Sequence, residues 1–188
     1  MRGRLCSRNA HKLEELRAAL PDWTLELLEP DRPYPPEDGA TYAENARGKA
    51  LFGREFAESD EWVLGEDSGI EVAALGGRPG VHSARYGGDG SAKERLLRQL
   101  ADAGDRGARY VCTIVAVGSG GAEIVVQGTL DGSVAREERG SEGFGYDPIF
   151  VPDGESLTVA ELGNAWKRRN SHRARAAAAL AAQLTRDP

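Results

Sequence analysis

Residues 61–72 read EWVLGEDSGIEV. The apolar start of this segment is typical of a buried strand, and two adjacent carboxylates, Glu66 and Asp67, follow it. The Ser-Gly pair after them favours a tight turn between two strands. Carboxylates repel each other and resist burial. Two of them at a strand end therefore predict a site that holds a cation.

Helical and strand patterns alternate on both sides of this segment. We expect strands at residues 3–7, 23–28, 62–66, 71–75, 110–117, 123–130 and 132–137. We expect helices after the N-cap residue Asn9, from the capping box Thr41/Glu44 to about residue 58, after the capping box Ser91/Glu94, and over 172–184. This mixture predicts an α/β fold with an elongated mixed β-sheet and flanking helices.

Length and composition restrict the class of protein. The chain has 188 residues, 40% of them hydrophobic, so we expect residues 1–188 to form a single domain with two lobes. A net charge of −6 argues against binding to nucleic acid or to an anionic membrane. We see no signal peptide and no apolar run near ~20 residues. Cys6 and Cys112 lack metal-ligand spacing, and buried reduced thiols suit a cytoplasmic protein.

Residues 7–12 read SRNAHK and join the first strand to a helix. Backbone N–H groups at a helix start favour anions, and Ser7, Asn9 and Lys12 add donors. The alternative interpretation is an ordinary capped helix with a surface lysine, because the glycines of a P-loop are missing.

Lys49 lies on one face of the helix that starts after Thr41. The spacing of three and four residues places it with Tyr42, Asn45, Phe52 and Phe56. A lysine in an aromatic seam either extends to solvent or points at an anion in a cleft. The lysines of this arginine-rich chain are few, which draws attention to each of them.

Acidic residues form a third pattern, with Glu37 and Asp38 in a Pro-rich loop and Glu66 and Asp67 at the strand end. Mg²⁺ takes oxygen ligands and needs only one or two carboxylates when it also binds phosphates. The alternative is a solvated acidic loop, which fits Asp38 well.

The segment GFGYDP at 143–148 places Phe144 between two glycines that allow close approach to a ligand. An aromatic ring there can stack on a base, or the segment can be a turn with core aromatics. Residues 167–173, KRRNSHR, form a basic cluster at an expected helix start, and a solvated basic face is the alternative.

Five blocks in this order resemble the inosine/xanthosine triphosphate pyrophosphatases: SRNAHKLEEL, EDGATYAENARGKA, EDSGIEVAALGGRPGVHSARY, GFGYDPIF and SHRARA. The resemblance covers about residues 4–180. It implies two lobes around a central nucleotide-binding cleft, a homodimer and Mg²⁺-dependent hydrolysis of ITP, dITP or XTP to the monophosphate and pyrophosphate.

The resemblance also implies residue roles. Asp67 is the expected catalytic residue and metal ligand, and Glu37 is a second metal ligand. The expected substrate-binding residues are Ser7, Arg8, Asn9, Ala10, His11, Lys12, Lys49, Ser68, Phe144, Gly145, Tyr146, Asp147, Lys167, His172 and Arg173. Arg8 departs from the family, which usually has glycine there, and Arg168 stands where asparagine is common. Glu66, where aspartate is frequent, is interpreted as a supporting residue.

Three other functions stay open at this stage. The chain could be a pyrophosphatase of the Maf-like type that acts on other nucleotides, although GFGYDPIF argues against it. It could be a nucleotide-binding module without catalysis, which the set of Glu37, Lys49 and Asp67 disfavours. Binding of single-stranded nucleic acid conflicts with the net charge of −6.

Overall fold

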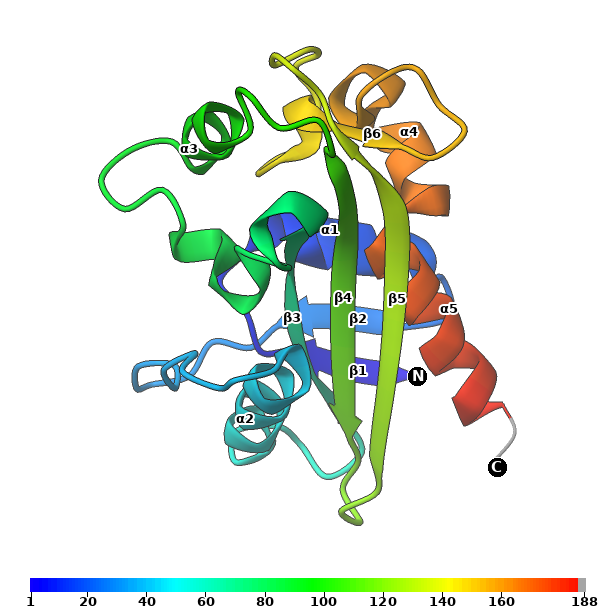
Figure 1. Ribbon diagram of the computed structural model, residues 1–188. Helices are drawn as coiled ribbons and strands as arrows, with labels where there is room; N and C mark the ends of the chain where they lie inside the picture. Colours follow the sequence, from blue (N-terminus) through cyan, green and yellow to red (C-terminus); the bar gives the residue numbers. More distant parts are fainter. Residues whose placement is uncertain (186–188) are drawn as a thin grey trace. The chain divides into compact units, whose positions relative to one another are not determined.

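The computed structural model describes residues 1–185 and has an α/β architecture (Figure 1). The strands are β1 (Arg2–Leu5), β2 (Thr24–Leu27), β3 (Trp62–Val72), β4 (Gly107–Val117), β5 (Glu123–Val134) and β6 (Phe150–Pro152). The α-helices are α1 (Ala10–Ala19), α2 (Tyr42–Arg54), α3 (Ala92–Gln99), α4 (Val159–Asn170) and α5 (His172–Leu184). Short 3-10 helices are η1 (Ala73–Leu75), η2 (Gly80–Arg85) and η3 (Asp147–Ile149).

The strands form one sheet in the order β2-β1-β3-β4-β5-β6. Strand β1 pairs in parallel with β2 and with β3, whereas β5 and β6 are antiparallel. The sheet is therefore mixed, as predicted.

The chain divides into two compact units. Unit 1 contains Met1–Asp67, Cys112–Gly128 and the chain from Arg173 onward, and unit 2 contains Ser68–Val111 and Thr129–His172. Strands β3, β4 and β5 contribute residues to both units. Each unit has its own apolar core, so each is described by itself.

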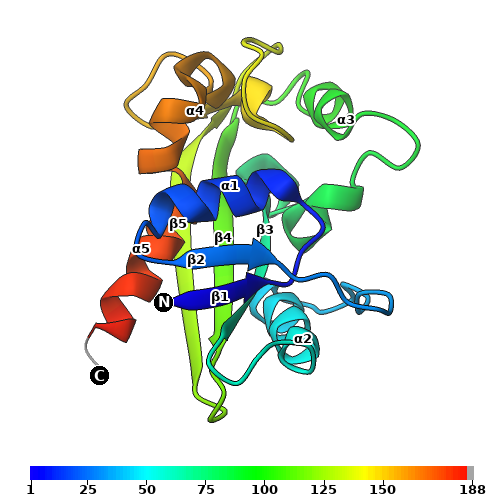
Figure 2. The ribbon, with the colours of Figure 1, turned by 180° about the vertical axis from the view of Figure 1, so that it is seen from behind.

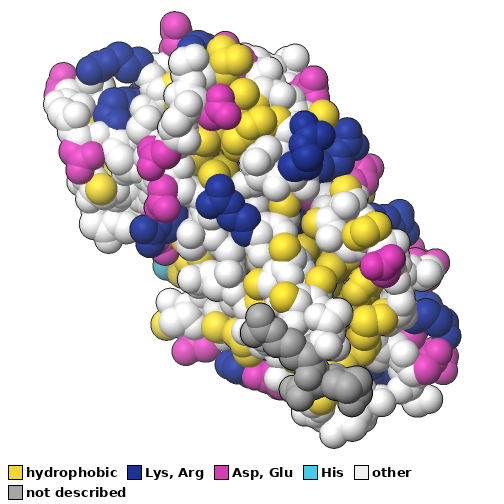
Figure 3. Space-filling view, turned by 90° about the vertical axis from the view of Figure 1, so that its right-hand side faces the viewer, with side chains coloured by type: hydrophobic (Ala, Val, Ile, Leu, Met, Phe, Trp, Pro, Cys, Tyr) yellow, Lys and Arg dark blue, Asp and Glu magenta, His cyan; other side chains and the backbone are white. Residues whose placement is uncertain are grey.

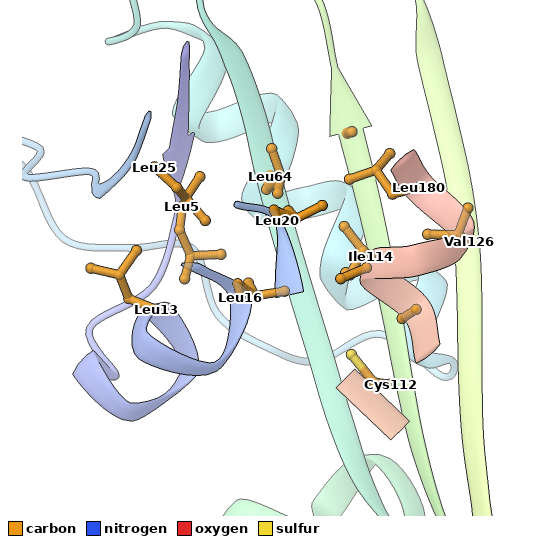
Figure 4. Packing of buried hydrophobic residues seen from close by; sticks show 13 residues of the cluster. Leu5, Leu13, Leu16, Leu20, Leu25, Leu64, Cys112, Ile114, Val126 and Leu180 are labelled. Atoms are coloured by element: carbon orange, nitrogen blue, oxygen red, sulfur yellow. The ribbon is translucent and has the colours of Figure 1, made fainter. Parts of the chain in front are cut away.

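The core of unit 1 lies between α1, α5 and the strands. Leu16 of α1, Leu5 of β1, Leu64 of β3 and Leu180 of α5 are fully buried in it together with Ile114. Figure 4 shows these side chains pointing toward one another from their separate elements. Figure 2 shows α1 alongside β2, which explains why its leucine stripe is buried.

The core of unit 2 is built on aromatic and aliphatic side chains. Tyr110 and Phe150 pack with ring centroids 4.2 Å apart. Ile70 and Val72 from β3 and Leu96 from α3 are fully buried around them.

The turn expected at Ser68 and Gly69 is wrong. Both residues lie inside β3, which continues as one strand from Trp62 to Val72. β3 is a central strand of the sheet, which pairs with β1 over Trp62–Leu64 and has β4 as its other neighbour, so its backbone groups enter the sheet. Glu66 and Asp67 therefore stand in the middle of a central strand and not at a strand end.

Other expected boundaries also change. The two strands predicted over 123–137 are one strand, β5, and α2 ends at Arg54 before the predicted residue 58. Helix α4 and strand β6 were not predicted, and α4 bends at Gly163, whose φ is 82°. The basic cluster 167–173 therefore spans the end of α4 and the start of α5, and it does not simply open a helix.

Charges are dispersed on the surface. On the face that Figure 3 shows, basic and acidic side chains are interspersed and do not form one basic field. Among residues 1–185, no helix has the length and apolar character needed to cross a membrane.

Candidate functional site

Helix α2 approaches β3 closely at Gly65 in unit 1. A Cβ atom on Gly65 would lie 1.9 Å from the carbonyl oxygen of Ala46 and 2.7 Å from the amide nitrogen of Ala50. Only glycine allows this contact between backbones. The approach brings Asn45 and Lys49, which directly precede Ala46 and Ala50 on the helix, within reach of the polar residues of β3. In both ribbon views, α2 lies beside β3 (Figures 1 and 2).

Lys49 is buried against two carboxylates, which excludes the interpretation that it extends to solvent. Its Nζ donates to Glu37 Oε1 at 2.6 Å and to the Glu66 carbonyl oxygen at 2.7 Å, and it lies 3.5 Å from Asp67 Oδ1. Burial by itself would lower the pKa of Lys49, but the charges of Asp67 and Glu66 outweigh it and raise the pKa. We call Glu37, Lys49 and Asp67 the acidic cluster.

Asp67 is the carboxylate of this cluster with the character of a base. Burial raises its pKa above the ordinary value, and Lys49 together with a hydrogen bond from Asn45 offsets only part of that shift. The Asn45 bond, from Nδ2 to Asp67 Oδ2, is 3.0 Å long. A carboxylate with a raised pKa holds a proton more strongly, as a general base requires.

Glu66 points to different partners and has the opposite character. Its Oε2 lies 2.6 Å from Lys12 Nζ, and its Oε1 accepts from Arg173 Nε at 3.1 Å and Nη2 at 3.0 Å. Burial would raise its pKa, but Lys12 and Arg173 hold the pKa well below the ordinary value. Glu15 accepts from Arg173 Nη1 at 2.6 Å. We call Lys12, Glu15, Glu66 and Arg173 the buried ion-pair network.

The thiol of Cys112 belongs to the same surroundings. Its Sγ donates to Glu66 Oε1 at 3.3 Å, and burial, followed by the charge of Glu66, raises its pKa well above the ordinary value. Cys6 is buried as well, with its pKa raised by burial to about 12. Both cysteines are free thiols, in agreement with the prediction of buried reduced thiols.

The polar groups of the loop before α1 form hydrogen bonds with that loop and with the first turn of α1. The side chain of Asn9 accepts from the backbone N–H groups of His11, at 3.0 Å, and Lys12, at 3.3 Å. Ser7 Oγ accepts from the Asn9 N–H at 3.1 Å. Two backbone N–H groups at the helix start, which were expected to face phosphate, are thus bonded to the Asn9 side chain. Ala10 is the first residue of the helix.

Arg8 needs no special backbone conformation. Within residues 1–185, positive φ values occur only at glycines. The Arg8 guanidinium lies over the ring of Tyr34, 5.0 Å from its centroid. Arginine is therefore compatible with this loop, although the resemblance implied a glycine at this position.

Unit 2 contains a second group of predicted residues around Asp147. Asp147 Oδ2 accepts from the Phe144 N–H at 2.8 Å and from Lys167 Nζ at 2.6 Å, and Oδ1 accepts from the Tyr110 hydroxyl at 3.2 Å. Lys167 Nζ lies 3.9 Å from the centroid of the Phe144 ring. Gly143 has a φ of 77°, and a Cβ there would lie 2.2 Å from Asp147 Oδ2. We call Phe144, Asp147 and Lys167 the aromatic cluster.

The other predicted residues of unit 2 lie around this cluster with different exposure. His172 is buried and stacks on Tyr110, with ring centroids 4.7 Å apart and an interplanar angle of 22°. The Tyr146 hydroxyl donates to the Ser83 carbonyl oxygen at 2.8 Å. Gly145 is exposed, and Ser68 is half-buried in β3.

Sequence reasoning did not assign three residues of these groups. Asn45 was noted only as a polar interruption of the aromatic seam, although it shares the face of Lys49. Glu15 lies one helical turn after Lys12, so the spacing of three residues could have indicated a shared partner. Nothing in the local sequence marks Cys112 as a partner of Glu66.

Comparison with known proteins gives the family. The chain matches the model of the Ham1 family over residues 4–183. It is 44% identical over 185 residues to the dITP/XTP pyrophosphatase of Gloeobacter violaceus, covering 97% of this chain and 93% of that protein. It is 47% identical over 189 residues to the dITP/XTP pyrophosphatase of Mycobacterium tuberculosis, covering 94% and 91%.

A solved structure agrees with this match. The Ham1 protein of Staphylococcus aureus is 35% identical to this chain, with a TM-score of 0.86 and full coverage of both chains. The fold and the sequence thus lead to the same relatives, and the chain belongs to the Ham1 family.

Proposed function

We propose that the protein hydrolyses ITP, dITP and XTP to the nucleoside monophosphate and pyrophosphate, with Mg²⁺ as its metal. The observation that carries this proposal is the acidic cluster, in which Glu37 and Asp67 converge on the ammonium of Lys49. The dITP/XTP pyrophosphatases that share 44% and 47% of its residues support the reaction and the substrate class.

The acidic cluster has the chemistry that a magnesium ion needs. Mg²⁺ prefers oxygen ligands and usually combines one or two carboxylates with waters and phosphate oxygens. Glu37 and Asp67 already accommodate one positive charge between them, that of Lys49. Within residues 1–185, no three His, Cys, Asp or Glu side chains are grouped to hold a metal ion. We therefore expect phosphate oxygens to complete the coordination.

The residues of unit 1 divide the reaction among them. When bound, the metal neutralises phosphate charge and lowers the pKa of a coordinated water. Asp67 takes the proton of the water that attacks the α-phosphorus, a role that fits its raised pKa. Lys12 and Lys49 stabilise the negative charge that develops on the leaving pyrophosphate.

The aromatic cluster supports recognition of the base. A purine ring can stack on Phe144, which is half-buried, and the ammonium of Lys167 beside it is a hydrogen-bond donor. Hypoxanthine and xanthine carry an acceptor oxygen at position 6, where adenine carries an amino donor. Donors left unpaired against adenine would cost about 1–3 kcal/mol each.

A panel of nucleoside triphosphates tests the proposal. With MgCl2, we expect ITP, dITP and XTP to give monophosphate and pyrophosphate, with kcat/KM about 10²-fold above that of ATP. Release of inorganic phosphate, or equal kcat/KM for ITP and ATP, would refute the assignment. Binding of ITP without turnover would favour a nucleotide-binding module, and turnover of other nucleotides only would favour the Maf-like alternative.

We further propose a homodimer in the cytoplasm. The free thiols of Cys6 and Cys112 fit a reducing compartment. Light scattering coupled to size-exclusion chromatography measures the mass directly, and a monomeric mass would contradict the dimer.

A further inference from the structure

We infer that Asn45 is a positioning residue that fixes the Asp67 carboxylate relative to the loop that carries Glu37. The inference rests on the proposed function, because the two carboxylates matter only if they act together on a metal-bound triphosphate. It starts from the contacts of one buried amide.

The orientation of the Asn45 amide follows from its partners. Its Oδ1 lies 2.8 Å from the backbone nitrogen of Gly39, which is a donor and so requires an acceptor. Nδ2 must then face Asp67 Oδ2, 3.0 Å away, and it donates to that carboxylate. One planar group thus ties two separate segments, and its two bonds have opposite polarity.

The tied segments are those of the acidic cluster. Gly39 follows Glu37 by two residues in the loop, and Asp67 is in β3. A Cβ on Gly39 would lie 2.7 Å from Asn45 Oδ1, so the loop approaches the amide as closely as its backbone permits. The side chain of Asn45 is buried, where water does not easily replace a lost hydrogen bond.

Lys49 joins the same two acidic residues in a different way. Its ammonium faces Asp67 Oδ1 and Glu37 Oε1, and it competes with any other cation for these oxygens. Asn45 is neutral and holds Asp67 through the other oxygen, Oδ2. It can therefore keep its bonds whichever cation occupies the cluster, which is what a fixed support requires.

Aspartate, leucine and serine do not reproduce both bonds. Aspartate keeps an acceptor for Gly39 but places a second carboxylate against Asp67. Leucine keeps the branched shape of asparagine but is larger and loses both bonds, and serine is too short to reach both partners. Asn45→Leu therefore removes both hydrogen bonds and adds some volume, which Asn45→Ser does not.

Steady-state kinetics with ITP and MgCl2 test the inference. We expect Asn45→Leu to lower kcat by about tenfold or more, which equals about 1.4 kcal/mol and the scale of one buried hydrogen bond. KM for ITP should stay within about threefold, since Asn45 bonds to the Asp67 carboxylate and the Gly39 N–H and not to the predicted nucleotide contacts. Asn45→Ser covers the case in which the leucine variant does not fold.

Thr41→Ala is the matched control on the same helix. Thr41 Oγ1 accepts from the Glu44 N–H at 3.1 Å and caps α2, so its loss lowers the melting temperature without touching Asp67. We expect its kcat to stay within about twofold of the wild type. If Asn45→Leu loses stability but keeps kcat in the same way, Asn45 is only structural and the inference is overturned.

A binding readout separates this inference from the proposed function. We expect MgCl2 without nucleotide to raise the melting temperature of the wild type, and to raise that of Asn45→Leu clearly less. An undiminished rise in the variant overturns the inference even if the enzyme is active. If the wild type releases no pyrophosphate from ITP, the proposed function fails and the inference falls with it. A wild type that is active while Asn45→Leu keeps its kcat overturns the inference alone.

Discussion

The acidic cluster and the aromatic cluster both contain a buried lysine, but they use it differently. Lys49 shares its ammonium among Glu37, Asp67 and a backbone carbonyl. Burial raises the pKa of Asp67 despite the charge of Lys49. Lys167 pairs with the single carboxylate of Asp147 and lies on an aromatic ring. The first arrangement suits a site whose charges change when a ligand binds. The second is a balanced pair that holds a loop, with the lysine over the half-buried ring of Phe144.

The first prediction compares the loss of stability when a buried carboxylate is neutralised, at Glu66 and at Asp147. Glu66 compensates both Lys12 and Arg173, so Glu66→Gln should lower the free energy of unfolding by about 3–5 kcal/mol. Asp147→Asn leaves one lysine uncompensated and should cost less. Urea unfolding at pH 7 measures both variants. Equal losses would contradict the difference between the two regions.

The second prediction concerns the reactive carboxylate. Asp67→Asn should lower kcat for ITP by ~10² or more, the scale of a lost general base, while circular dichroism shows a folded protein. Asp38→Asn, an exposed carboxylate of the same loop as Glu37, is the control and should keep its activity within about twofold. Near-full activity of Asp67→Asn would remove Asp67 from its assigned role.

The third prediction concerns the aromatic cluster. Phe144→Leu keeps an apolar side chain but removes the ring, and stacking on a base contributes about 1–3 kcal/mol. We expect KM for ITP to rise about tenfold, with a smaller effect on kcat. Phe56→Leu, a half-buried aromatic of unit 1, serves as the control. A KM that does not change in Phe144→Leu would place the base elsewhere.

The fourth prediction concerns how the free energy of unfolding depends on pH. The folded-state pKa of Glu66 lies well below 4.5, so its ionised form stabilises the fold above that pH, and this contribution is lost as the pH falls through the folded pKa. The stability difference between wild type and Glu66→Gln should shrink below pH 4.5 by about 1.4 kcal/mol per pH unit. Urea unfolding of both proteins between roughly pH 3 and pH 7 measures the stability difference on both sides of the ordinary glutamate pKa. A difference that grows in acid would show that Glu66 is not held ionised.

Local signals predicted four of the five α-helices in residues 1–185 and missed α4, although Thr158 and Glu161 form a capping box at its start. Asn9 and Thr41 cap α1 and α2 as expected, and α5 covers the expected range. Such signals are short in range, because a cap depends on a side chain and an N–H group two or three residues away. Both predicted capping boxes form their first half, in which Thr41 accepts from the Glu44 N–H and Ser91 from the Glu94 N–H. In the second half of the Thr41 box, Glu44 accepts from the Ala40 N–H instead.

The strand errors arise where the neighbours of a segment decide its structure. Ser68 and Gly69 have turn propensity, but they lie inside β3, a central strand that pairs with β1 over Trp62–Leu64 and has β4 as its other neighbour. The different partners of Glu66 and Asp67 could not be predicted from the sequence either. Adjacent residues of a strand point to opposite faces, so each carboxylate meets partners from different elements, and only the fold brings those partners together.

Gly65 takes no part in the chemistry, yet the site should not tolerate its substitution. An alanine there would meet the backbone of α2, so the helix would have to retreat and take Asn45 and Lys49 with it. A genetic screen for loss of activity should therefore mark Gly65 together with the charged residues. Because the clashing atoms belong to the backbone of α2, no change of side chain in that helix removes them, and suppressor mutations for Gly65 should be rare.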